Sequence, residues 1–297
     1  MQKIIFGIFI TSLLLSSAAY AQEVNFGKPA LQTVKIELDE NGNAHVTHIV
    51  EESRESQQIS VLRDDFTNLN IADEDGGSTQ YAETSGERLG FLIFPSNDRV
   101  LVQYDLANAA TEKNGLWVWD YIYLASTTFY LPENTSIVFV NSNPILLGEI
   151  QGVRCHGCQV MLEYELNSEE RTQQVKWEDK TFDVKILATG EISDLRFDQP
   201  NKKISFDIME KDQYVTLVIP KELLWNPYEV LLDEDKLLKH EFYKTDDAVW
   251  LNFRANQTGT VDIIGVSAVP EFPLAGILVL GAAMIFAAKF GSRLSRR

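Results

Sequence analysis

The sequence is poor in the residues and motifs that most often reveal an activity. Only two cysteines occur in 297 residues, which excludes a disulfide-dense miniprotein. The motifs Gly-x-Ser-x-Gly, His-Glu-x-x-His, Walker A and Gly-x-Gly-x-x-Gly are missing, and their absence lowers the expectation of catalysis. Basic residues are scarce as well: 26 Lys and Arg stand against 43 Asp and Glu, which argues against nucleic acid as a partner. We therefore expect no enzymatic activity, no cofactor and no resident metal.

What the sequence does contain is enough apolar material for folded domains. Hydrophobic residues make up 45% of the chain, which excludes a largely disordered protein. A chain of 297 residues has room for roughly two domains.

The N-terminus has the layout of a secretory signal. Lys3 provides a positive start, residues 4–15 are apolar, and Ala19-Tyr20-Ala21 provides the small residues that a signal peptidase needs. We expect cleavage after Ala21, so that 1–21 is a signal peptide. The alternative is an N-terminal anchor that is not cleaved, but the apolar run is short for a membrane span.

The C-terminus has the pattern of a membrane anchor. Residues 274–290 are apolar apart from Lys289, and the stretch from Phe272 to Phe290 can just cross a hydrocarbon core of roughly 30 Å as a helix. The basic tail 291–297 follows, so the positive-inside rule places this tail in the cytoplasm and the preceding chain outside the cell. The alternative is a buried core helix. Segment 1–21 has a net charge of +1 and 271–297 of +3, which leaves −21 on the external residues 22–270.

The external region has the pattern of an all-β fold. Apolar and polar residues alternate, and no stretch keeps a helical period over three turns. Regularly spaced short strands favour β-sandwiches. We expect two tandem β-sandwich-like domains, at 30–166 and 175–267, joined by a polar linker at 167–174. In the first domain, expected strands include 99–105, 115–124, 126–131, 136–141 and 159–165.

Acidic turns separate several of these strands. Asn41-Gly42 is a typical pair for a tight hairpin, because both residues tolerate a positive φ. The turn at 73–77 contains Asp73, Asp75 and Gly76, which match part of a calcium-binding EF-hand loop, but the remaining ligands are not in the expected places. Ordinary hairpin turns are the favoured interpretation, and calcium binding is the alternative.

The residues just before the apolar span carry a resemblance to a known family. Val269-Pro270-Glu271-Phe272-Pro273, with the span and the arginine-rich end, resembles the tail of archaeal PEF-CTERM and PEFG-CTERM surface proteins. In the PEFG form, a glycine stands where this sequence has Pro273. Segment 175–267 is similar to the β-rich domain that often precedes this tail in ammonia-oxidising archaea.

The resemblance implies a location and a processing route, with no known activity. Members are secreted, held transiently by the tail, and thought to be processed near the motif by an archaeosortase, a membrane transpeptidase. Residues 268–273 would then be sorting motif and spacer. The implied partners are the membrane, an archaeosortase and surface-layer or other envelope proteins.

Cys155-His156-Gly157-Cys158 is the one constellation that could carry reactivity. A disulfide between Cys155 and Cys158, in a tight turn or bulge before the strand at 159–165, is the favoured interpretation, because disulfides persist outside the cell. Two alternatives stay open. One is a redox pair in which His156 lowers a thiol pKa, and the other is a zinc or copper site formed by Cys155, Cys158 and His156.

Three further groups of residues are candidates for a binding or modification site. His45 and His48 are three apart on an expected strand, so they should point to opposite faces and not share a metal. An alternating aromatic row could stack on carbohydrate, although a place in the core is favoured; it consists of Trp117, Trp119, Tyr121 and Tyr123. Asn134 and Asn256 begin glycosylation sequons.

Together these features predict a secreted, membrane-anchored cell-surface protein with a structural or binding role in the archaeal envelope. The alternative is an envelope redox or metal-binding protein that uses the Cys-His-Gly-Cys segment.

Overall fold

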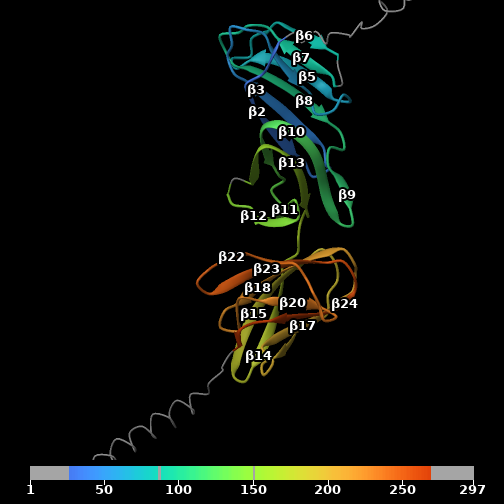
Figure 1. Ribbon diagram of the computed structural model, residues 1–297, viewed down its shortest axis with the longest axis vertical. Helices are drawn as coiled ribbons and strands as arrows, with labels where there is room; N and C mark the ends of the chain where they lie inside the picture. Colours follow the sequence, from blue (N-terminus) through green and yellow to red (C-terminus); the bar gives the residue numbers. More distant parts are fainter. Residues whose placement is uncertain (1–26, 86–87, 150, 269–297) are drawn as a thin grey trace, which may run out of the picture. The chain divides into compact units, whose positions relative to one another are not determined.

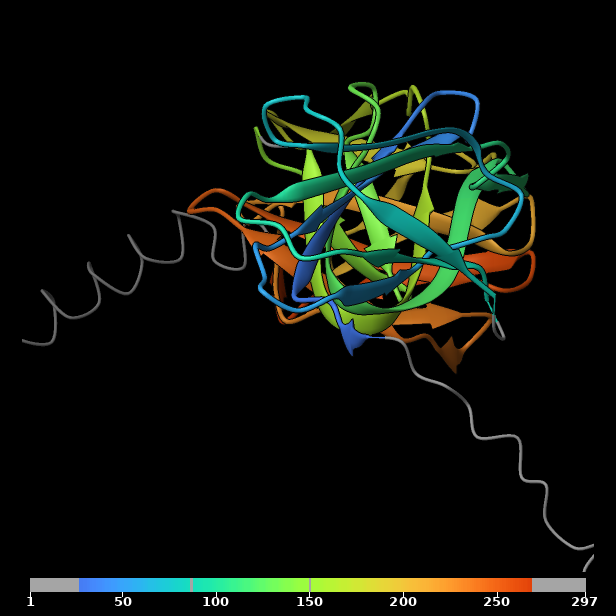
Figure 2. The same cartoon turned by 90° about the horizontal axis from the view of Figure 1, so that it is seen from above.

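The computed structural model describes residues 27–85, 88–149 and 151–268, and every regular element in these ranges is a β-strand. Figure 1 and Figure 2 show this all-strand chain from two directions. The expected all-β fold class is confirmed for this part of the chain. It contains no helix that is long and apolar enough to cross a membrane. The expected signal peptide at 1–21, motif residues 270–273, span 274–290 and tail 291–297 lie outside the described ranges.

The chain divides into two compact units, and the boundary between them runs through β2, β3, β5 and β8. Within the described ranges, one unit contains 27–32, 48–65 and 70–102, and the other contains 33–47, 66–69 and 103–268. The division into domains at 30–166 and 175–267 stays a prediction.

Strands from the first part of the described chain form two sheets. The larger sheet has the order β12-β11-β13-β10-β2-β3-β8-β5, and β9 pairs with β10 beside this path. The smaller sheet has the order β1-β4-β7-β6. The strands of the larger sheet are β2 (Gln32–Leu38), β3 (Ala44–Val50), β5 (Thr67–Asp73), β8 (Val100–Leu106), β9 (Thr111–Lys113), β10 (Leu116–Tyr130), β11 (Ile137–Val140), β12 (Asn143–Leu146) and β13 (Gly152–Tyr164). Those of the smaller sheet are β1 (Lys28–Pro29), β4 (Gln57–Ser60), β6 (Tyr81–Thr84) and β7 (Gly90–Ile93).

The strict alternation of β2 and β3 explains why they form a hairpin with one buried row. In β3 every second residue from Ala44 to Val50 is buried. The turn between the strands is closed by Asp39, whose Oδ1 accepts hydrogen bonds from the backbone N–H groups of Asn41 and Asn43, both at 2.8 Å. Gly42 has a φ of 76°. The expected Asn41-Gly42 hairpin is thereby confirmed.

Two five-stranded sheets form the C-terminal part and share one hydrophobic core. Their orders are β14-β15-β18-β23-β22 and β16-β17-β24-β20-β21. The first contributes Val184, Leu217 and Leu251 to the core and the second contributes Ile204, Val230 and Ile263, all fully buried. The strands of the first sheet are β14 (Arg171–Trp177), β15 (Lys180–Ala188), β18 (Gln213–Pro220), β22 (Lys239–Lys244) and β23 (Ala248–Ala255). Those of the second are β16 (Arg196–Asp198), β17 (Lys203–Ile208), β20 (Glu229–Leu232), β21 (Asp235–Lys236) and β24 (Gly259–Ile264).

The expected linker at 167–174 overlaps a strand. Residues 171–174 belong to β14, and Gln174 pairs with Asp183 of β15. The polar sequence hid this strand because β14 is the edge strand of its sheet, where most side chains before Val175 face solvent. A separate short pair, β19 (Leu224–Trp225) with β25 (Ser267–Ala268), ends the described chain.

Candidate functional site

The Cys-His-Gly-Cys segment lies inside a long strand, not in a turn before one. β13 begins at Gly152, and Figure 1 shows it beside β10, which is also long. The expectations of a strand starting at 159 and of two strands at 115–124 and 126–131 were therefore wrong. The break that we expected is a register shift opposite the segment, between Tyr123 and Ser126 of β10.

This irregularity changes how residues 155–158 are related. Cys155 lies opposite Thr127, His156 opposite Ser126, and Cys158 opposite Tyr123. In an unbroken strand, residues three apart occupy opposite faces. Gly157 has a φ of 62°, a conformation that glycine adopts without steric cost, and bulges of this kind interrupt the alternation. The backbone therefore does not impose opposite faces on the two cysteine positions.

His156 is directed to the neighbouring strand. Its side chain is exposed, and its Nδ1 lies 3.1 Å from the hydroxyl oxygen of Ser126. No group of three or more His, Cys, Asp or Glu suited to hold a metal ion, and no free cysteine, occurs among the described residues. Reactive Cys-x-x-Cys pairs of the thioredoxin type begin a helix, whereas this segment lies in a strand.

A second constellation joins three adjacent strands and was missed by sequence reasoning. His45 of β3, Asp105 of β8 and Asn68 of β5 meet because these strands are neighbours in the sheet. The Nδ1 of His45 lies 2.7 Å from one carboxylate oxygen of Asp105, and the amide of Asn68 donates to the other at 2.7 Å. The three residues are far apart in sequence, so only the strand order brings them together.

The groove at this constellation has an acidic lining. Its volume is about 610 Å³, and Glu37, Asp39, His45 and Asp105 contribute to its wall. Hydrogen bonds from Asn68 and then from His45 lower the pKa of Asp105, so this carboxylate is ionised at neutral pH. An ionised Asp105 accepts a hydrogen bond from the Nδ1–H of His45. In the tautomer that makes this bond, Nε2 carries no proton and can act as an acceptor. The groove can therefore receive a hydrogen-bond donor or a basic group.

His48 lies in the buried row of β3, and His45 lies in the other row. The side chain of His48 is fully buried, with its Nδ1 2.9 Å from Oε1 of Gln32. The side chain of His45 is 41% exposed. The prediction that the two histidines do not share a face is confirmed.

The turn at 73–77 uses its first aspartate for backbone hydrogen bonds. Oδ1 of Asp73 accepts from the N–H groups of Asp75 at 3.0 Å and Gly77 at 2.6 Å. This arrangement is an ordinary side-chain-closed turn. The calcium alternative receives no support from the described side chains.

Trp119 belongs to the core, so the aromatic row does not form a carbohydrate platform at this position. Its side chain is fully buried, and its ring lies edge-on to that of Phe129, with 5.7 Å between the centroids. The core interpretation is confirmed for Trp119.

The two sequons differ in their surroundings. The side-chain amide of Asn134 donates to Glu40 at 2.9 Å and to Asn167 at 3.0 Å, and the next residue, Thr135, is buried. Asn256 lies in the connection between β23 and β24, where all three sequon residues are exposed. Asn256 is therefore the more accessible acceptor.

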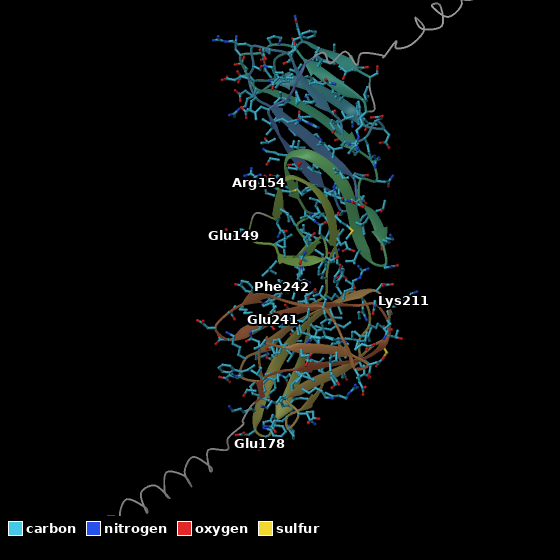
Figure 3. All side chains as sticks on the ribbon, in the orientation of Figure 1. Glu149, Arg154, Glu178, Lys211, Glu241 and Phe242 are labelled. Atoms are coloured by element: carbon cyan, nitrogen blue, oxygen red, sulfur yellow. The ribbon has the colours of Figure 1, made fainter. Side chains whose placement is uncertain are left out.

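Glu241 of β22, labelled in Figure 3, forms two ion pairs. It pairs with Lys239 and Lys244 and accepts hydrogen bonds from the N–H of Tyr228 at 2.9 Å and the amide of Asn226 at 3.0 Å. Burial raises the pKa of Glu241, but these donors outweigh burial and lower it to about 2. Because both carboxylate oxygens are engaged, this cluster is structural.

Comparison with protein-family models and with curated proteins gives no match. The candidate sites are therefore defined by their geometry and chemistry alone. Ala21 and the motif residues Pro270, Glu271, Phe272 and Pro273 lie outside the described ranges.

Proposed function

We propose that this chain is a secreted, membrane-anchored protein of the archaeal cell surface, with a structural or binding role and no catalytic activity. One observation carries the proposal: a signal pattern, an external region, a PEF-type motif, an apolar span and a basic tail follow one another in order. The all-strand architecture of 27–268 supports it, because β-sandwich modules are common in cell-surface proteins. Two tandem sandwich-like domains would then stand outside the membrane.

Membrane anchoring by residues 269–297 can be tested by fractionation. The full chain and a chain ending at Ala268 are produced in an archaeal host and separated into membrane and medium fractions. The full chain should sediment with membranes and resist a high-salt wash, while the shorter chain should be released. A full chain that is soluble, or a truncated chain held as firmly as the full one, would contradict an anchor in 269–297.

We place the binding role at the groove around His45 and Asp105. Its wall carries three carboxylates, and His45 is held by Asp105 with one ring nitrogen available. A basic group on a neighbouring envelope protein is the complementary partner.

We also propose that Cys155 and Cys158 form a disulfide and that Asn256 carries a glycan while Asn134 does not. The disulfide is supported by the lack of a free cysteine in the described chain and by the irregular backbone at Gly157. Exposure of the whole sequon supports the glycan at Asn256. The redox and metal functions remain the alternative for the same cysteines.

A further inference from the structure

The last described residues are fixed to the folded region by a short strand pair. In this pair Leu224 lies opposite Ala268, and Trp225 lies opposite Ser267. Leu224 and Ala268 are buried, and the N–H of Val266 donates to the carbonyl of Trp225 at 3.0 Å. The last described residue, Ala268, is therefore held beside Leu224 and next to Trp225.

Two hydrophobic residues at this strand pair are exposed to solvent. Trp225 is 55% exposed and Val266 is 54% exposed. Single exposed hydrophobic residues are common on protein surfaces, but here a tryptophan and a valine lie on paired segments. The ammonium group of Lys202 lies beside them and donates to the carbonyl of Val266 at 3.0 Å.

The length of the connection limits how far this surface can lie from the membrane. Only residues 269–273 separate Ala268 from the apolar segment that starts at Leu274. Even a fully extended connection spans at most about 20 Å from Ala268 to Leu274. The interfacial layer on each side of the hydrocarbon core is roughly 5–8 Å thick. An anchored chain therefore holds Ala268 within about 20 Å of the hydrocarbon core, which is short enough for the neighbouring Trp225 to reach the lipid headgroups.

We propose that Trp225 inserts into the headgroup region of the membrane that holds the anchor, with Val266 beside it. This inference rests on the proposed function, because it requires the membrane span. Tryptophan suits this position because its ring is apolar while its indole N–H can bond to water or headgroups. The strand pair would thus orient the C-terminal region on the membrane, in addition to the tether.

Quenching of tryptophan fluorescence by lipids tests this contact. The full chain is reconstituted into vesicles of zwitterionic and anionic lipid that carry a nitroxide near the headgroup. The segment 274–290 contains no tryptophan, so the span itself cannot contribute to the signal. Trp225→Phe is compared with Trp117→Phe, in which a partly buried tryptophan of β10 is replaced. The wild type and Trp117→Phe should be quenched, and Trp225→Phe should lose most of that quenching.

Flotation of the vesicles separates the two possible failures. If the full chain does not float with the vesicles, the anchor and the proposed function fail, and this inference fails with them. If the chain floats but Trp225→Phe is quenched as strongly as the wild type, only the contact of Trp225 is overturned. Emission that changes with protein concentration and not with the nitroxide would assign this surface to a second copy of the chain, which also overturns the inference.

Discussion

His48 is a neutral histidine in the core, and its burial couples stability to pH. Burial lowers the pKa of His48 from 6.5 to about 3. Between pH 6.5 and pH 3 the unfolded chain binds a proton at His48 that the folded chain excludes. The contribution of neutral His48 to stability is therefore fully present above pH 6.5 and is lost progressively as the pH decreases toward 3. The contribution changes by at most about 1.4 kcal/mol per pH unit.

We expect the wild type to lose about 2 kcal/mol more stability than His48→Gln between pH 8 and pH 5. Urea denaturation at both pH values measures this difference, and His45→Gln is the control because His45 is half-exposed on the other face of β3. Equal losses in the wild type and His48→Gln would show that His48 does not set this pH dependence.

At the scale of elements, the β2–β3 hairpin depends on the lack of a side chain at Gly42. Its φ of 76° favours glycine, and an added Cβ would collide with the ring of Trp117 and the carbonyl of Ala110. Gly76 is a matched control: its φ is 84°, but no atom lies within 4 Å of the position of an added Cβ.

Both alanine substitutions should therefore incur the conformational cost of a positive φ. Only Gly42→Ala should also incur a steric cost from collision of its Cβ with neighbouring atoms. We expect Gly42→Ala to be less stable than Gly76→Ala by about 1–3 kcal/mol, measured by chemical denaturation. Equal stabilities of the two variants would mean that the hairpin moves aside without cost.

Local sequence patterns predict some of these elements, and others depend on contacts between distant strands. The hairpin at 39–43 and the separation of His45 from His48 follow from local alternation and turn chemistry. The full length of β13 was not evident, because its first half contains Arg154, His156 and the irregular Gly157. Strand β14 was missed at an exposed edge. The meeting of His45 with Asp105 depends on strand order, which no local pattern contains.

At the scale of the whole molecule, the proposed function requires that the acidic region with the described strands lies outside the cell, between a signal peptide and an anchor. The net charge of −21 lies on 22–270, and the groove at His45 adds a local acidic surface. Such a charge keeps a crowded surface protein soluble and attracts basic partners. The predicted signal and anchor lie outside the described ranges, and processing of the two termini decides whether the proposed surface location holds.

Intact-mass measurement of the native protein, purified from membranes, tests that claim most directly. We expect a chain that begins at Gln22, with both cysteines oxidised and a glycan that is lost in Asn256→Gln and kept in Asn134→Gln. A C-terminus within or near 270–273 would report processing at the motif, and a C-terminus at Arg297 would report a retained anchor. A mass that includes residues 1–21 would contradict a cleaved signal and the surface location built on it.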